Sequence, residues 1–175
     1  GVLGQADFAM SKIASSEAYG GPLMRKAIDY FCHMAVEPGF YATVKEVDPE
    51  FSATDHFTRM SWLRNENDDI YDPDYSDLLR VILIAKFGRG KLADLVSLLS
   101  GRNFETRTFE TQIAEESFKT LEAGIKDYMN EDNFKRFLMI VRSAGFIDVS
   151  FIRSKAVLNF SYALYLALRD QKVEA

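Results

Sequence analysis

The chain is poor in the residues that build most recognisable sites, with one cysteine and two histidines among 175 residues. The lone Cys32 excludes an intrachain disulfide, and neither histidine has a metal-ligand partner three or four residues away. Cys32 follows Ile28 and Phe31 on one apolar helical stripe. We therefore predict that its thiol belongs to the core of a protein from a reducing compartment.

Proline and long apolar runs are also scarce. Four prolines and ten glycines leave little material for long irregular loops. The longest apolar run, Ala156–Leu168, is shorter than the ~20 residues of a membrane span and contains Asn159 and Ser161. No signal peptide precedes it. We expect a protein without membrane segments that resides in the cytoplasm.

What the chain does have is apolar and aromatic surface, with 47% hydrophobic residues, 14 Phe and 8 Tyr. The apolar positions recur at helical spacing, which predicts an all-α domain over residues 1–175, with eight to ten helices in irregular, orthogonal packing. The principal expected helices are Asp7–Ile13, Gly21 to about residue 36, Phe40–Val47, Ala53–Leu63, Pro73–Phe87, Lys91–Ser100, Thr108–Met129, Phe134–Arg142 and Ser154–Arg169.

The last of these helices differs from the others. Residues Ala156–Leu168 are apolar nearly all round, whereas a surface helix has one polar face. We predict that this helix is central and is buried between other helices.

Charge is unevenly distributed along the chain. Residues 1–78 contain 6 Lys/Arg and 14 Asp/Glu, and residues 79–175 contain 15 and 12. Two interpretations stay open: solvated surfaces, or one face that accepts an anion. Five basic residues gather at two neighbouring helix–loop junctions around Phe104, where they either contact nucleic-acid phosphates or complement helix dipoles. They are Lys86, Arg89, Lys91, Arg102 and Arg107.

No catalytic, cofactor-binding or metal-binding residue is predicted in the chain. The Gly88-Arg89-Gly90-Lys91 segment lacks the spacing of a phosphate loop and predicts a connection between helices. His33 and His56 form no recognisable dyad. An acidic cluster lacks the glycine and final glutamate of a calcium loop, so we interpret it as a solvated loop with a helix cap. Its members are Asp68, Asp69, Asp72 and Asp74.

Four segments together resemble a known family. The segments are Gly1–Ile13, Arg25–His33, Leu98–Thr108 and Phe137–Leu166. They are similar to the helical portion of the GmrSD-type family, the ParB/sulfiredoxin-like domain of modification-dependent (type IV) restriction proteins and their bacterial relatives. The resemblance is a pattern of apolar and small residues over nearly the whole chain.

The resemblance implies a non-catalytic helical module of a bacterial, cytoplasmic restriction or defence protein. The family's nucleotide-hydrolysing site lies in an N-terminal α/β portion with an Asp-Gly-Gln-Gln-Arg-type motif and a Phe-x-x-x-Asn segment, and neither occurs here. The chain does not begin with Met, so we expect a fragment of a larger protein. NTP and a divalent metal would belong to the missing portion.

The implied partners are that N-terminal NTPase portion and a C-terminal nuclease-type region, with DNA or a second copy of the chain as further candidates. An alternative function is a protein–protein interaction or dimerisation module in another pathway. A third is an enzyme with a site that no motif reveals.

Overall fold

The computed structural model describes residues 1–66 and 69–171. Within these ranges the chain forms ten α-helices and three 3-10 helices, and the only β-type pairing is an isolated bridge between Arg102 and Phe109. The all-α prediction is confirmed. The α-helices are α1 (Gln5–Ala14), α2 (Gly21–Val36), α3 (Phe40–Val47), α4 (Pro49–Ser52), α5 (Asp55–Arg59), α6 (Tyr75–Phe87), α7 (Leu92–Leu99), α8 (Thr111–Tyr128), α9 (Glu131–Ser143) and α10 (Lys155–Asp170). The 3-10 helices are η1 (Glu17–Tyr19), η2 (Ser61–Asn65) and η3 (Val149–Phe151).

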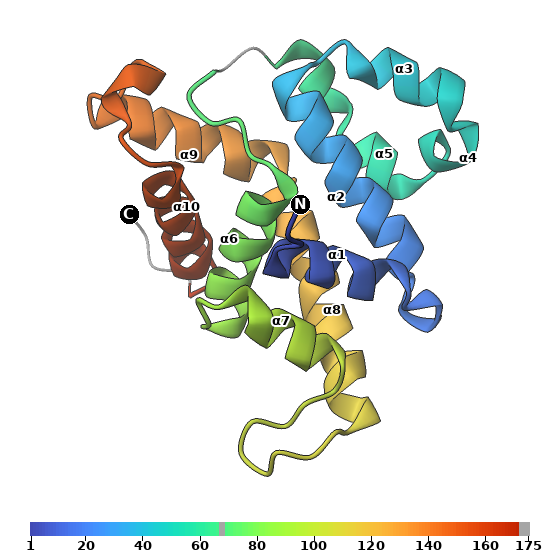
Figure 1. Ribbon diagram of the computed structural model, residues 1–175. Helices are drawn as coiled ribbons and strands as arrows, with labels where there is room; N and C mark the ends of the chain where they lie inside the picture. Colours follow the sequence, from blue (N-terminus) through green and yellow to red (C-terminus); the bar gives the residue numbers. More distant parts are fainter. Residues whose placement is uncertain (67–68, 172–175) are drawn as a thin grey trace.

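Helix α6 occupies the centre of the molecule. It packs against α10 on one side and against α8, α2, α7 and α1 on the others (Figure 1). Helix α1 lies against α2 and α7, and the short helices α3, α4 and α5 gather beside α2. Helix α9 runs from beside α2 to the upper left of Figure 1, and α10 lies at the left edge of the view.

The ends of α6 follow from its sequence. The side chain of Asp74 accepts a hydrogen bond from the backbone N–H of Asp77, and the side chain of Asp77 accepts one from the N–H of Asp74. This reciprocal cap satisfies two backbone donors that the first turn leaves free. Gly88 ends the helix in the left-handed conformation, at φ 62°. The predicted connection at Gly88–Lys91 is confirmed.

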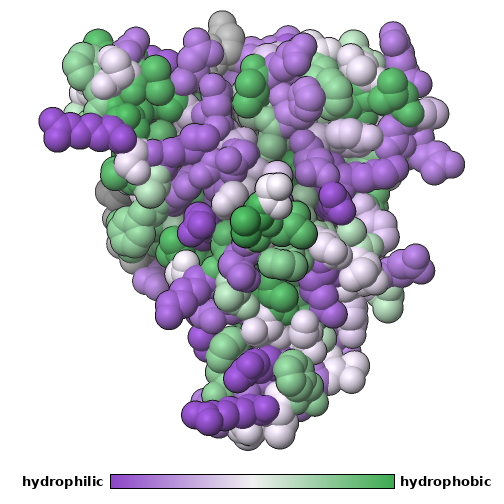
Figure 2. All heavy atoms as spheres, viewed as in Figure 1, coloured by the Kyte–Doolittle hydropathy of each residue, from purple (hydrophilic) through white to green (hydrophobic). Residues whose placement is uncertain are grey.

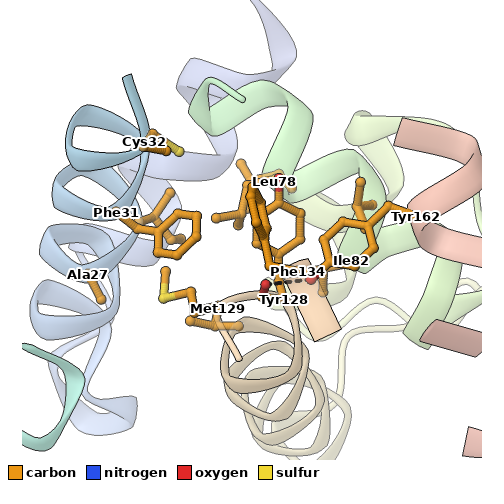
Figure 3. Close-up of a cluster of buried hydrophobic side chains, with 14 of the residues drawn as sticks. Ala27, Phe31, Cys32, Leu78, Ile82, Tyr128, Met129, Phe134 and Tyr162 are labelled. Carbon is orange, nitrogen blue, oxygen red and sulfur yellow. Dashed lines mark hydrogen bonds between the residues drawn. The ribbon is translucent and has the colours of Figure 1, made fainter. Parts of the chain in front are cut away.

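The core is an aromatic cluster to which four helices contribute. The rings of Phe31 (α2), Tyr128 (α8), Phe134 (α9) and Tyr162 (α10) meet with centroid distances of 4.9–6.2 Å (Figure 3). Most of these pairs are edge-to-face or tilted, the arrangements that ring quadrupoles favour. Cys32 is buried, as predicted.

Two local predictions are wrong. The helix expected over 53–63 is interrupted: α5 ends at Arg59, and η2 begins at Ser61. Thr54 caps α5 through its hydroxyl, which accepts from the N–H of Phe57 at 3.4 Å. In the helix expected over Asp7–Ile13, the apolar pattern predicts that Phe8 and Ile13 point inward. Ile13 is buried, but Phe8 is 47% exposed, and α1 buries Ala6, Ala9 and Met10 instead.

The largest correction concerns α10. It does not run between other helices but lies at the edge of the molecule, with one face on α6 and the other uncovered by the described residues (Figure 1). The prediction of a fully buried last helix is therefore wrong, although the helix itself spans nearly the predicted residues.

Candidate protein-interaction surface

Helix α10 has two apolar faces with different surroundings. Its inner face buries Leu158, Tyr162 and Leu166 against the core. Its outer face carries a second apolar stripe at spacings of three and four residues, and every member is 40–62% exposed. We call it the outer stripe: Val157, Phe160, Leu164 and Leu168.

A groove runs along one edge of the outer stripe. It encloses about 470 Å³ between α9 and α10, beneath the segment that connects them. Helix α9 supplies Phe137, Ile140 and Val141 to its wall, and Ala144 follows directly after the helix. Helix α10 supplies Val157, Leu158, Ser161 and Tyr165.

The connecting segment, residues 144–154, is itself apolar and uncovered. Phe146 and Phe151 line the groove, and Ile147 and Val149 beside them are more than half exposed. Gly145 turns the chain out of α9 at φ 97°, a conformation that favours glycine. Figure 2 shows apolar side chains at the upper left, where the end of α9 and η3 lie in Figure 1, with hydrophilic side chains projecting beside them.

Ten large apolar side chains of α9, α10 and their connection are 40–65% exposed. Half-exposed side chains of this size present about 100 Å² each. About six such side chains side by side already equal the largest apolar patch of a typical monomer, about 300–600 Å². The ten are the outer stripe together with Met139, Ile140, Phe146, Ile147, Val149 and Phe151.

A buried polar chain fixes α10 beneath this surface. The Tyr128 hydroxyl donates to that of Tyr71 at 2.8 Å, and Tyr71 donates to Oδ1 of Asn159 at 2.8 Å. Nδ2 of Asn159 donates to Asp77 at 2.7 Å, and Nζ of Lys155 lies 3.2 Å from the same carboxylate. Each buried polar group thus finds a partner, so α10 is held in one position on α6.

Burial raises the pKa of Tyr71 and of Tyr128 well above the usual value of 10. Both phenols therefore stay protonated at neutral pH and can act as donors in the chain. In the connecting segment, hydrogen bonds from the side chain and backbone of Ser150 lower the pKa of Asp148. Asp148 therefore keeps its negative charge beside η3.

The structure brings together two of the five predicted basic residues. The guanidinium of Arg89 stacks on the ring of Phe104 at 3.9 Å, and that of Arg102 lies 5.8 Å from the same ring. Arg89 also lies 3.4 Å from Asp94, which neutralises part of its charge.

The other three do not join this pair. Lys86, near the end of α6, forms ion pairs with Asp127 of α8 and Asp170 of α10. Lys91 precedes α7 and Arg107 lies in the loop before α8, both exposed. Of the five predicted residues, two thus lie together and three lie apart from them. The role of all five in DNA contact stays a prediction.

The histidine, cysteine and acidic side chains of the described residues form no metal site. No group of three or more His, Cys, Asp or Glu side chains in residues 1–66 and 69–171 is arranged to hold a metal ion. Of the predicted acidic cluster, Asp74 caps α6 and Asp68 lies outside the described residues. None of the described helices has the length and hydropathy that a bilayer crossing requires.

Sequence reasoning missed the groove, although a signal for it existed. The segment between α9 and α10 contains five large apolar residues, whereas loops are usually polar. Because Phe146, Ile147 and Ile152 precede the last predicted helix, the sequence suggests that they lead into a buried helix. Apolar residues in a connection at the surface equally indicate an interface that the chain itself does not cover.

Comparisons with protein-family models, with curated proteins and with solved structures found no match to this chain. The resemblance to the GmrSD-type family is accordingly still a prediction.

Proposed function

We propose that the chain is a protein-interaction module that binds a segment of another protein along the outer stripe of α10 and in the groove beside it. The observation that supports this is a helix with two apolar faces of which the fold covers one. The burial of large apolar side chains is the main favourable contribution to protein association. Each Å² of apolar surface removed from water contributes about 25 cal/mol of free energy.

A heterotypic partner fits this surface better than a ligand of small size. The groove alone has the volume of a small-molecule site. The outer stripe, however, continues past the groove to Leu168, near the end of α10. An occupant that covers both must be extended along the helix, as a polypeptide segment is.

Site-specific photo-crosslinking in the cells that make the protein tests this proposal. A photoreactive amino acid at Leu164 should form adducts that map to one segment of one other protein. The same amino acid at Lys119, an exposed position on α8, is the matched control and should give no such adduct. Adducts that are absent at position 164, or that match those at 119, would contradict the proposal. Adducts between two copies of the chain would contradict its heterotypic form.

The family resemblance supports a second candidate, a helical module of a GmrSD-like restriction protein that contacts DNA. The observation in its favour is the pair of arginines around Phe104, because arginine predominates in contacts to phosphate. Replacing Arg89, Lys91 and Arg102 with Glu in the full-length protein should weaken DNA binding. A variant with Glu at Lys12, Lys45 and Lys119 changes the net charge equally and is the control. Unchanged DNA binding at low salt would reject this role.

A further inference from the structure

The segment that forms the groove has a charge opposite to that of the chain as a whole. Helices α9 and α10 with their connection, residues 131–170, contain six Lys/Arg and four Asp/Glu, a net charge of +2. Since the whole chain has a net charge of −5, the other residues together carry −7. The apolar surface therefore lies in a basic region of an acidic protein.

Three exposed arginines border the apolar surface at separate points. Arg153 lines the groove itself. Arg136 lies one helical turn before Ile140 on α9, and Arg169 follows Leu168 at the end of α10. Together they place positive charge at several edges of one apolar area, as at an interface with an apolar centre and a charged rim.

We propose that the occupant of this surface is an amphipathic α-helix of another protein, and that Asp and Glu residues flank the apolar face of this helix. This proposal rests on the proposed function. The apolar face would pack on the outer stripe, whose members recur at spacings of three and four residues, as in helix-to-helix contacts. The flanking carboxylates would lie near Arg136, Arg153 and Arg169, where the long guanidinium side chains can reach them.

Charge also argues against a second copy as the occupant. Two copies that meet through the same surface would oppose two segments of net charge +2 and bring the arginines of both copies together, and like charges across an interface are unfavourable. The headgroups of a flat anionic bilayer would complement the charges of the arginines. The flat surface cannot enter a groove of about 470 Å³, however, as a side chain of a helix can. The acidic helix satisfies both the charge and the shape.

The test uses two designed helical peptides and the full chain. Both peptides have leucines at spacings of three and four, and they differ in carrying Glu or Lys on the flanks. Binding is followed by fluorescence anisotropy at low and at physiological salt. We expect the Glu-flanked peptide to bind about tenfold more tightly at low salt, with a smaller ratio as salt screens the rim charges.

Four variants test whether this surface binds the peptides. Replacing Arg136, Arg153 and Arg169 with Glu should remove or reverse the preference for the Glu-flanked peptide. The control variant, in which Lys12, Lys45 and Lys119 are replaced with Glu, has the same net charge and should keep this preference. Leu164→Asp should abolish binding of both peptides, with Phe160→Asp as a second variant and circular dichroism as the control for folding.

The outcomes separate the two proposals. Equal binding of both peptides that Leu164→Asp abolishes would overturn the acidic partner and leave the interaction module standing. Tighter binding of the Lys-flanked peptide would have the same meaning. Binding of neither peptide would overturn the inference, and the crosslinking result then decides the module itself. Binding to vesicles of anionic phospholipid, without binding to the Glu-flanked peptide, would overturn the acidic helix in favour of a membrane surface.

Discussion

Helices α6 and α10 have similar patterns of apolar residues and different surroundings. Both are apolar around most of their circumference, and they pack against each other. Helix α6 is enclosed by α10, α8, α2, α7 and α1, so its large apolar residues are buried or half-buried. Helix α10 is covered on the α6 side, while Phe160 on its outer stripe is 58% exposed.

The difference shows what the pattern of apolar residues determines and what it does not. An all-round apolar helix needs cover on all sides, because apolar surface in water is unfavourable. The pattern does not say whether the cover comes from the same chain. For α6 the chain supplies it. For α10 we propose that a partner does.

The strongest test of the comparison uses two leucines on α10. Leu166 is 2% exposed and Leu164 is 48% exposed. Leu166→Ala leaves a cavity in the core, so we expect the free energy of unfolding to fall by about 2–5 kcal/mol. Leu164→Ala should change it by about 0.5 kcal/mol or less. Urea denaturation of both variants measures this, and equal losses would show that the two faces of α10 are alike.

The buried polar chain between α6 and α10 gives the next largest effect. Tyr71→Phe removes the hydroxyl that donates to Asn159 and accepts from Tyr128. Leaving these groups without a partner should lower the free energy of unfolding by about 1–3 kcal/mol. The control is Tyr75→Phe, whose hydroxyl bonds to Asp7 nearer the surface and whose loss should be smaller. A greater loss for Tyr75→Phe would contradict the role of the chain.

The smallest effect concerns Lys86, which joins the ends of α6 and α10 by its ion pair with Asp170. Desolvation by burial lowers the pKa of Lys86, but hydrogen bonds to Asp127 and Asp170 outweigh it and raise the pKa above 10.5. The stabilisation is therefore complete below pH 10.5 and is lost as the pH rises through the raised pKa.

Lys86→Met should accordingly reduce the free energy of unfolding by about 1 kcal/mol or less at pH 8. The difference from the unmodified protein should shrink above pH 10.5. Lys119→Met removes an ion pair within α8 and serves as the control. A difference that grows with pH would contradict the assigned direction.

Much of the fold could be predicted because local signals mark the helix boundaries. Phe40–Val47 has the predicted bounds, and α2 begins at Gly21 as the Gly-Pro pair indicates. The helix expected from Thr108 begins at Thr111 instead. Phe109 pairs with Arg102, a contact between residues that no helical pattern reveals.

The candidate site was less predictable, because it is defined by apolar side chains that the other described residues do not cover. The sequence identifies Phe160 and Leu164 as apolar, but their exposure depends on where α9 and the connecting segment lie in space. Of the five basic residues predicted to gather around Phe104, the structure places Arg89 and Arg102 against its ring.

The polar chain that anchors α10 also has a consequence for the rate and affinity of binding. Since Asn159 and Asp77 hold the helix in place without a partner, the docking surface is organised in advance. Docking of a proposed partner would then not include the entropic cost of ordering α10, which would add to the loss of translational and rotational freedom. We expect association to be limited by diffusion and orientation rather than by a rearrangement of this protein.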